Sequence, residues 1–231
     1  MISIIVPVLN EAACIRPLLE ALKALEGEKE IIVTDGGSID GTVELAQSVA
    51  GVTVVLSEPG RGQQLRRGVA AAAGEVFWFV HADSVVAPEA LTVIREALGT
   101  DQPGAAGYGC FSLYFSDADT SGLRWISRTS NSRARRLRLI FGDQGLFITR
   151  RTYETVGGFK PIPIMEDWEL SRRLSRLGAP RVLETPIGTS GRRFIEEGIF
   201  RTLMRMHWRK LRFTLGASVE RLAKEYKEVR S

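Results

Sequence analysis

The sequence predicts an α/β protein with a Rossmann-like, mostly parallel sheet, helices on both faces and a C-terminal helical tail. Short apolar runs rich in β-branched residues alternate with segments whose apolar residues recur at helical spacing, which is the pattern of a parallel sheet crossed by helices. Polar residues follow three of these runs, and ligands of such sheets bind at the carboxyl ends of strands. Its 231 residues allow one large domain or two small ones.

Strands and helices are predicted in strict alternation over the first hundred residues. The expected strands cover residues 2–9, 30–34, 52–56 and 76–80. The first expected helix carries Ile15, Leu18, Leu19, Leu22 and Leu25, with Asn10 placed to cap it, and the others cover 41–50, 62–73 and 88–98.

The pattern is less regular after residue 105. We expect strands at 105–115, 146–149 and 180–184, and helices at 121–139, 165–177 and 194–229, the last with a break near Gly216. No internal repeat, low-complexity segment or linker interrupts the chain. We therefore predict one domain, residues 1–191, followed by a basic amphipathic tail, residues 192–231.

Composition excludes several classes of protein. Hydrophobic residues make up 44% and charged residues 25%, which excludes a disordered chain, a collagen and a disulfide scaffold. Cys14 and Cys110 match no metal-binding spacing, and the N-terminus lacks the features of a signal peptide. No apolar run approaches the roughly 20 residues that cross a bilayer. We expect a cytoplasmic protein, with the inner face of the membrane as an alternative place.

Positive charge is concentrated in two segments. The tail holds 11 Lys and Arg against 5 Asp and Glu, whereas the rest of the chain holds 20 against 22, which together give the net charge of +4. A second cluster of six arginines without an acid lies between Arg124 and Arg138. Such clusters attract phosphates, nucleic acids or anionic lipid headgroups.

The first group of candidate site residues follows the first two predicted strands. It combines Pro7-Val-Leu-Asn-Glu11 with Asp35-Gly-Gly-Ser-Ile-Asp-Gly-Thr42. Glycine after a strand permits a tight turn and a close approach of the backbone to a ligand. Asp35 is suited to accept a hydrogen bond from a uracil N–H or a ribose hydroxyl, whereas Asp40 is better explained as turn chemistry.

Here the sequence resembles a known family. The two segments above, together with Pro59-Gly-Arg-Gly62, His81-Ala-Asp83, Phe141-Gly-Asp-Gln-Gly145 and Glu166-Asp167, resemble the motifs of family-two inverting glycosyltransferases of GT-A fold. Their order and spacing agree from residue 2 to about residue 190. The chain is most similar to small single-domain bacterial members, and each motif alone is weak.

The resemblance implies a nucleotide-diphosphate-sugar donor, with a UDP-sugar as the default because of Asp35. It places the donor nucleotide near Pro7, Asn10, Glu11, Asp35, Gly36, Arg61, His81 and Ala82. Relatives carry Asp-x-Asp at the end of the fourth strand, where the last Asp binds Mn²⁺ or Mg²⁺. Asp83 matches this metal position, and His81 replaces the first acid. Imidazole suits Mn²⁺ better than Mg²⁺, although His81 could equally bind ribose.

The catalytic residues implied by the resemblance lie at the start of a predicted helix. Asp167 matches the general base that withdraws the proton of the acceptor hydroxyl, and Glu166 either orients the site or faces solvent. An acid in the first turn of a helix is also ordinary, because it complements the helix dipole. In-line attack opposite the departing diphosphate inverts the anomeric carbon.

The remaining candidates surround the sugar and the diphosphate. Asp143, Gln144 and Trp168 match positions that line the sugar and acceptor pocket, with a plain turn and core packing as the alternatives. Arg192 and Arg193 suit phosphate oxygens, although solvated arginines at a helix start are an equal alternative.

The tail combines basic and apolar side chains between Phe194 and Leu215. It suits packing on the domain, which we favour, or on a second subunit in a homodimer, or on a membrane surface beside a lipid-linked acceptor.

Three other functions compete with sugar transfer. A non-catalytic nucleotide-sugar or lipid-binding module would explain the missing acid at His81. A sugar nucleotidyltransferase needs a glycine- and arginine-rich phosphate loop where this chain has Asn10-Glu-Ala-Ala-Cys14. Nucleic-acid binding lacks any recognisable module, so we expect no nucleic-acid partner.

Overall fold

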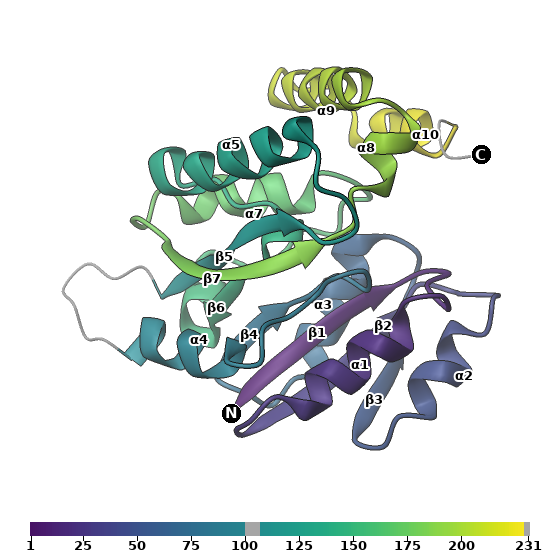
Figure 1. The fold of residues 1–231 in the computed structure, drawn as a ribbon, viewed down its shortest axis with the longest axis vertical. Coiled ribbons are helices and arrows are strands. Elements are labelled where there is room, and N and C mark those ends of the chain that lie inside the picture. The colour runs from purple at the N-terminus through teal and green to yellow at the C-terminus, as the bar shows by residue number, and fades with distance from the viewer. Residues whose placement is uncertain (100–106, 229–231) are drawn as a thin grey trace.

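The computed structural model of the protein describes residues 1–99 and 107–228. Its centre is a seven-stranded sheet with the order β3-β2-β1-β4-β6-β5-β7 (Figure 1). The strands are β1 (Ile2–Val8), β2 (Lys29–Asp35), β3 (Val52–Leu56), β4 (Val76–Phe79), β5 (Tyr108–Phe115), β6 (Phe147–Thr149) and β7 (Arg181–Thr189). β6 pairs antiparallel with β4 and β5, whereas the other pairs are parallel. The mostly parallel sheet is as predicted.

Helices cover both faces of this sheet, because the strands are apolar on both sides. Along β1, Ile4 and Val6 join one core cluster and Ile5 joins the other. The first cluster lies under α1 (Ile15–Ala24), α2 (Thr42–Gln47) and α4 (Ala90–Gly99). The second lies under α3 (Arg61–Ala71), α5 (Ser121–Leu137), α6 (Arg150–Thr155) and α7 (Glu166–Leu174).

Most predicted elements are present, with ends shifted by a few residues. β7 extends to Thr189 instead of ending at residue 184, and the short helix α6 was not predicted. Residues 105–106 of the predicted fifth strand lie outside the described residues.

The prediction that Asn10 caps the first helix is wrong. α1 begins at Ile15 after Cys14, which makes no capping hydrogen bond through its side chain. Asn10 has a left-handed φ of 57°, and its Oδ1 accepts a hydrogen bond from the Ile39 N–H at 2.9 Å. Its side chain is used across the loops, not along the helix.

The tail forms three helices that pack on the rest of the chain: α8 (Arg192–Glu196), α9 (Ile199–Thr214) and α10 (Val219–Glu228). Phe194 packs edge-on against Phe115, with ring centroids 5.5 Å apart. The Gly191 N–H donates to Asp117 Oδ1 at 2.7 Å. The division into a domain and a tail at residue 192 stays a prediction. Among the described residues, every helix is too short or too polar to cross a membrane.

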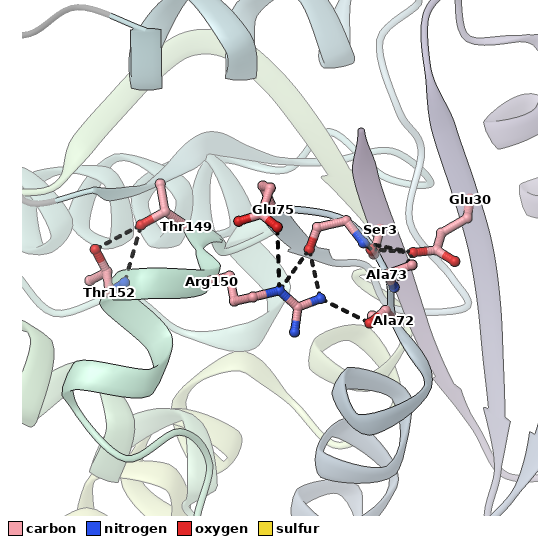
Figure 2. A network of polar contacts seen from close by, with 9 residues as sticks. Ser3, Glu30, Ala72, Ala73, Glu75, Thr149, Arg150 and Thr152 are labelled. Atoms are coloured by element: carbon pink, nitrogen blue, oxygen red, sulfur yellow. Dashed lines mark hydrogen bonds and ion pairs between the residues drawn. The ribbon is translucent and has the colours of Figure 1, made fainter.

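A network of polar contacts closes the amino-terminal end of the sheet (Figure 2). Glu30 Oε1 accepts hydrogen bonds from Ser3 Oγ at 2.5 Å, from the Ala73 N–H at 2.7 Å and from the Gly74 N–H at 3.0 Å. The Arg150 guanidinium donates to the carbonyl oxygens of residues 72 and 74 at 2.8–3.1 Å. The loop between α3 and β4 is thereby fixed to β1, β2 and α6.

Candidate active site

Two loops at the carboxyl ends of β1 and β2 are tied together by hydrogen bonds. The Asn10 N–H donates to Ser38 Oγ at 2.8 Å, and the Glu11 N–H donates to Thr42 Oγ1 at 2.8 Å. Together with the bond from Ile39 to Asn10 at 2.9 Å, these contacts hold the two predicted nucleotide segments side by side. Pro7 and Glu11, predicted for the same role, are half-buried.

Asp35 lies inside this pair of loops and is only 2% exposed. Its carboxylate accepts hydrogen bonds from the backbone N–H groups of Gly37 and Ser38 at 2.8–3.2 Å. A Cβ added at Gly36 would lie 3.0 Å from the Gln64 side chain, so glycine is needed there for space. The structure thus gives Asp35 and Gly36 a part in shaping the loop, and their contact with a nucleotide stays a prediction.

Helix α3 connects these loops to the predicted catalytic segment. Gln64 Nε2 donates to the carbonyl oxygens of Val8 at 2.6 Å and Thr34 at 2.9 Å, at the ends of β1 and β2. One turn earlier, Arg61 forms an ion pair with Glu166 and a longer one with Asp167, at 3.3 Å. One face of α3 therefore connects the carboxyl ends of β1 and β2 with the start of α7.

The two carboxylates at the start of α7 have different environments. Burial raises the pKa of Glu166, which is 1% exposed and paired with Arg61. We predicted that Glu166 either orients the site or faces solvent, and its burial excludes the second alternative. Met165, just before it, has a left-handed φ of 66°, a conformation that is uncommon for a residue other than glycine.

Asp167 is held in its charged form. Burial alone would raise the pKa of Asp167, but Arg61, two backbone N–H groups and His81 together hold that pKa below its usual value. The N–H groups are those of Gly142, 3.0 Å from Oδ2, and Trp168, 2.7 Å from Oδ1. A carboxylate has about four lone-pair directions, so Asp167 can still accept a proton. Its side chain lines a small cavity beside Arg61 and His81.

The end of β4 leads into His81, Ala82 and Asp83. Burial and, to a smaller extent, Arg61 lower the pKa of His81 to about 4, although Asp83 and Asp167 oppose the shift. The imidazole is therefore neutral near pH 7 and lies against Gly142, where an added Cβ would be 2.7 Å from His81 Nε2. Ala82 is buried and Asp83 is exposed.

These side chains fit a divalent cation that is shared with a diphosphate. Among the described residues, no three His, Cys, Asp or Glu side chains gather into a complete metal site. Mg²⁺ is commonly held by one or two carboxylates together with substrate phosphates and water. The exposed Asp83 and the neutral His81 supply such a partial set. Which of them binds a metal ion stays a prediction.

The predicted sugar-pocket residues lie near Asp167 but in different states. Gln144 is completely buried, and its Oε1 accepts a hydrogen bond from Arg133 at 2.9 Å, so its amide forms a contact inside the protein. Asp143 Oδ1 and Trp168 Nε1 are buried and have no hydrogen-bond partner among the described residues. Burial raises the pKa of Asp143. Contact of these three side chains with a sugar stays a prediction.

Lys210 of α9 lies beside the candidate site residues, a position that sequence reasoning did not predict. Its Nζ lies 4.0 Å from the centre of the Phe141 ring and 5.7 Å from that of Trp168. Arg133 approaches the same Phe141 ring to 3.6 Å. Burial and Arg133 lower the pKa of Lys210 to about 8, while Asp167 and Asp143 oppose the shift. In the sequence, Lys210 is one basic residue among many in the tail, so no local pattern distinguishes it.

The two arginines predicted for the diphosphate start α8. Arg192 is exposed, and its Nε lies 3.9 Å from Glu196 Oε1. The charges of Arg192 and Asp83 both act on the pKa of the Cys14 thiol, so both side chains lie near Cys14. Arg192 therefore lies on the side of the site that holds Asp83, the predicted metal ligand. Arg193 forms an ion pair with Glu197 at 3.2 Å. Their binding to phosphate stays a prediction.

Comparison with known proteins agrees with this picture. A family model described as glycosyl transferase family 2 matches residues 3–157. A "PGL/p-HBAD biosynthesis glycosyltransferase" of Mycobacterium tuberculosis is 27% identical over 182 residues, which cover 75% of this chain and 69% of the relative.

Solved structures share the fold. Glucosyl-3-phosphoglycerate synthase of Mycobacterium tuberculosis, solved with Mn²⁺, UDP and glucosyl-3-phosphoglycerate, superposes with a TM-score of 0.65 at 22% identity, over 94% of this chain and 81% of that one. A mannosyltransferase of Pyrobaculum calidifontis, solved with GDP-Man and Mn²⁺, gives 0.59 at 21% identity. The match covers 80% of this chain but only about half, 54%, of the mannosyltransferase. The predicted GT-A fold with a helical C-terminus is confirmed.

Proposed function

Because the chain belongs to glycosyl transferase family 2 and is a glycosyltransferase, we propose that it moves a hexose from a nucleotide-diphosphate-sugar donor to an acceptor hydroxyl with inversion of the anomeric carbon. A UDP-sugar is the default donor. Solved relatives of the same fold were crystallised with UDP and Mn²⁺ or with GDP-Man and Mn²⁺, which supports this class of donor.

The observation that carries the proposal is the environment of Asp167. Its pKa is held low by Arg61 and by the N–H groups of Gly142 and Trp168, so it is charged when an acceptor hydroxyl arrives. We assign to it the role of general base, which withdraws the hydroxyl proton as the oxygen attacks the anomeric carbon. A positioned base typically contributes 10²–10⁴-fold to a rate, in order of magnitude. Glu166 acts through Arg61, whose guanidinium it holds in place beside Asp167.

The donor is assigned to the loops after β1, β2 and β4. The linked loops at Asn10 and Asp35 are suited to the nucleoside, and Asp83 with His81 to a Mn²⁺ or Mg²⁺ ion beside the diphosphate. Such an ion stabilises the negative charge that develops on the departing diphosphate. Arg61, near His81, and Arg192, on the side of Asp83, provide further positive charge for the diphosphate.

The first experiment compares the wild type with Asp167→Asn. Donor turnover is followed as release of nucleoside diphosphate from UDP-glucose or GDP-mannose, and donor binding by calorimetry. We expect turnover to fall by about 10²-fold or more while the donor dissociation constant changes by less than about threefold, because the lost group acts on the acceptor. Wild-type turnover in the variant would remove Asp167 as the base. Donor binding without turnover in the wild type would instead favour a non-catalytic binding module.

The second experiment tests the cation. Asp83→Ala is titrated with UDP in the presence of Mn²⁺, of Mg²⁺ and of a chelator. The wild type should bind UDP more tightly with the metal ion, and the variant should lose most of that gain. An equal response to Mn²⁺ in both proteins would show that the ion is held elsewhere. Ser84→Ala, next to Asp83 and buried, is the matched control.

A further inference from the structure

Helix α9 turns a row of large apolar side chains away from the protein. Phe200, Met204, Trp208, Leu211 and Leu215 follow one another at intervals of four, four, three and four residues, which is one face of a helix. They are 77%, 56%, 58%, 49% and 77% exposed. We call these five side chains the outer stripe.

The opposite face of α9 packs on the protein and mixes the half-buried apolar side chains of Ile199, Met206 and Phe213 with polar ones. Thr202 is fully buried, Arg209 is 7% exposed, and Lys210 points into the candidate site beside Phe141. A surface helix of a soluble protein normally exposes a polar face, whereas α9 exposes the large apolar side chains of the outer stripe as well. The orientation of α9 is fixed by these inner contacts, so the outer stripe is presented to something outside the described chain.

Helix α5 lies beside α9 and adds positive charge. Near the start of both helices, a Cβ added at Gly122 of α5 would lie 2.5 Å from Ile199 Cδ1 of α9. Eleven residues further along each helix, Arg133 of α5 and Lys210 of α9 contact the same Phe141 ring. The two helices therefore run side by side at one end of the molecule (Figure 1).

Neither helix contains an acidic residue. α5 carries five arginines, and α9 carries four arginines and a lysine. The exposed members of this set are Arg124, Arg128, Arg135, Arg136 and Arg201. α5 also exposes Trp125, to 57%. Large apolar and aromatic side chains combined with cations and no acidic residue are the composition of a helix that lies in a membrane interface.

We propose that the outer stripe of α9, together with the arginines of α5, docks on the surface of an anionic lipid bilayer. A second copy of the chain is the less suitable occupant, because two such surfaces would bring like charges together, whereas anionic headgroups are complementary. The stripe enters the headgroup region while the inner face of α9 keeps its contacts with the site.

If the outer stripe lies on the membrane, the thickness of α9 determines the distance between the lipid headgroups and the candidate active site. A helix with its side chains is about 10–12 Å across, and Lys210 on the inner face of α9 contacts the ring beside Asp167. The acceptor side of the site would therefore lie about one helix diameter from the headgroups, within reach of a hydroxyl carried on a lipid. This last step rests on the proposed function, whereas the docking does not.

The test is co-sedimentation of the full chain with vesicles of phosphatidylcholine alone and with about 30 mol% phosphatidylglycerol, at about 0.1 M salt. We expect binding to the anionic vesicles that is at least about tenfold stronger than to the neutral ones and weakened at about 1 M salt. Trp208 should move to an apolar environment on binding, which is read as a blue shift of its fluorescence.

Two variants distinguish binding through the outer stripe from non-specific binding through any exposed apolar side chain. Phe200→Ser with Trp208→Ser should reduce binding to anionic vesicles by about tenfold or more. Leu177→Ser, at an exposed leucine on the loop that follows α7, should leave binding unchanged. All of these side chains are exposed, so thermal unfolding should stay close to that of the wild type.

Two outcomes would overturn the proposal. One is the absence of binding to both vesicle types, or undiminished binding of the double variant. The other is a stable dimer in sedimentation velocity that the double variant dissociates, which would assign the stripe to a second copy. UDP binding by calorimetry is measured in the same preparations, so a failure of membrane docking is distinguishable from a failure of the proposed glycosyl transfer.

Discussion

The two ends of the sheet use polar side chains in opposite ways. At the amino-terminal end, Ser3 donates to Glu30, Glu30 also accepts from the backbone, and Arg150 donates to backbone carbonyl oxygens (Figure 2). At the carboxyl-terminal end, Asp143 Oδ1 and Trp168 Nε1 are buried without a partner among the described residues. A buried polar group without a partner is costly, so these two groups lower the stability of the protein unless a bound molecule satisfies them.

Unusual backbone conformations and a shifted pKa also occur at the carboxyl end. Of the left-handed residues other than glycine among those described, Asn10 and Met165 lie in or beside the predicted site segments, whereas Arg138 ends α5. His81, with its pKa of about 4, lies at the carboxyl end. The carboxyl end holds groups in states that cost stability, and the amino end supplies stabilising contacts. Substitutions at the two ends should therefore separate stability from function.

The largest effect on stability is expected for Glu30→Ala. It removes the acceptor of three hydrogen bonds, one of them from the buried Ser3 hydroxyl, and we expect the free energy of unfolding to fall by about 2–3 kcal/mol. Chemical unfolding followed by circular dichroism measures this fall, and calorimetry with UDP should give wild-type affinity in the folded variant.

The matched control is Glu75→Ala in the same network. The Glu75 side chain is 81% exposed and lies 4.0 Å from Arg150 Nε in a long ion pair, so we expect a loss below about 0.5 kcal/mol. Equal losses in the two variants would mean that the hydrogen bonds of Glu30 contribute nothing beyond a surface charge, and the contrast between the two ends would fail.

A smaller effect is expected from Lys210 and depends on pH. The folded-state pKa of about 8 lies below the usual value near 10.5, so between these values the unfolded chain binds the proton that the folded chain has lost. Stability from this group therefore rises as pH increases from about 8 toward 10.5. Lys210 is partly exposed, and we expect the gain to be only about 1 kcal/mol.

Urea unfolding at pH 7.5 and near pH 10 checks this expectation. The difference in unfolding free energy between Lys210→Met and the wild type should change by about 1 kcal/mol between the two pH values, in favour of the wild type at the higher pH. Lys224→Met, on the exposed side of α10, is the control and should show no such change. A constant difference for Lys210→Met would show that the lysine is not held in a buried environment.

The sequence predicted the sheet well because its signals are local. Alternating apolar runs identified β1 to β4, and β3 was predicted with its observed ends, Val52–Leu56. The end of β7 was missed because Glu184-Thr-Pro lowers its apolar character, although the strand continues to Thr189 beside β5. Pairing with a distant strand overrode the local signal there.

Predicting the site was harder, because it is assembled from segments far apart in the chain. Motif spacing located the segments of Asp35, Asp83 and Asp167, but not the ion pairs that join Arg61 to Glu166 and Asp167 across more than a hundred residues. Gln144 appears in the motif as a polar residue beside glycine, yet it is fully buried. No spacing rule could assign Lys210 to the site, because only the packing of α9 on the domain brings it there.

The smallest effect on stability is expected for Asp143→Asn, the counterpart of Glu30→Ala at the other end of the sheet. Burial raises the pKa of Asp143, and its Oδ1 has no hydrogen-bond partner among the described residues, so the charged carboxylate contributes little that an amide would lose. We expect the free energy of unfolding to change by less than about 0.5 kcal/mol. Donor turnover in the same variant should fall severalfold if this carboxylate contacts the sugar. A stability loss as large as that of Glu30→Ala would show that Asp143 is a structural partner of Arg133 and Lys210, and that the two ends do not differ in the way their polar groups are used.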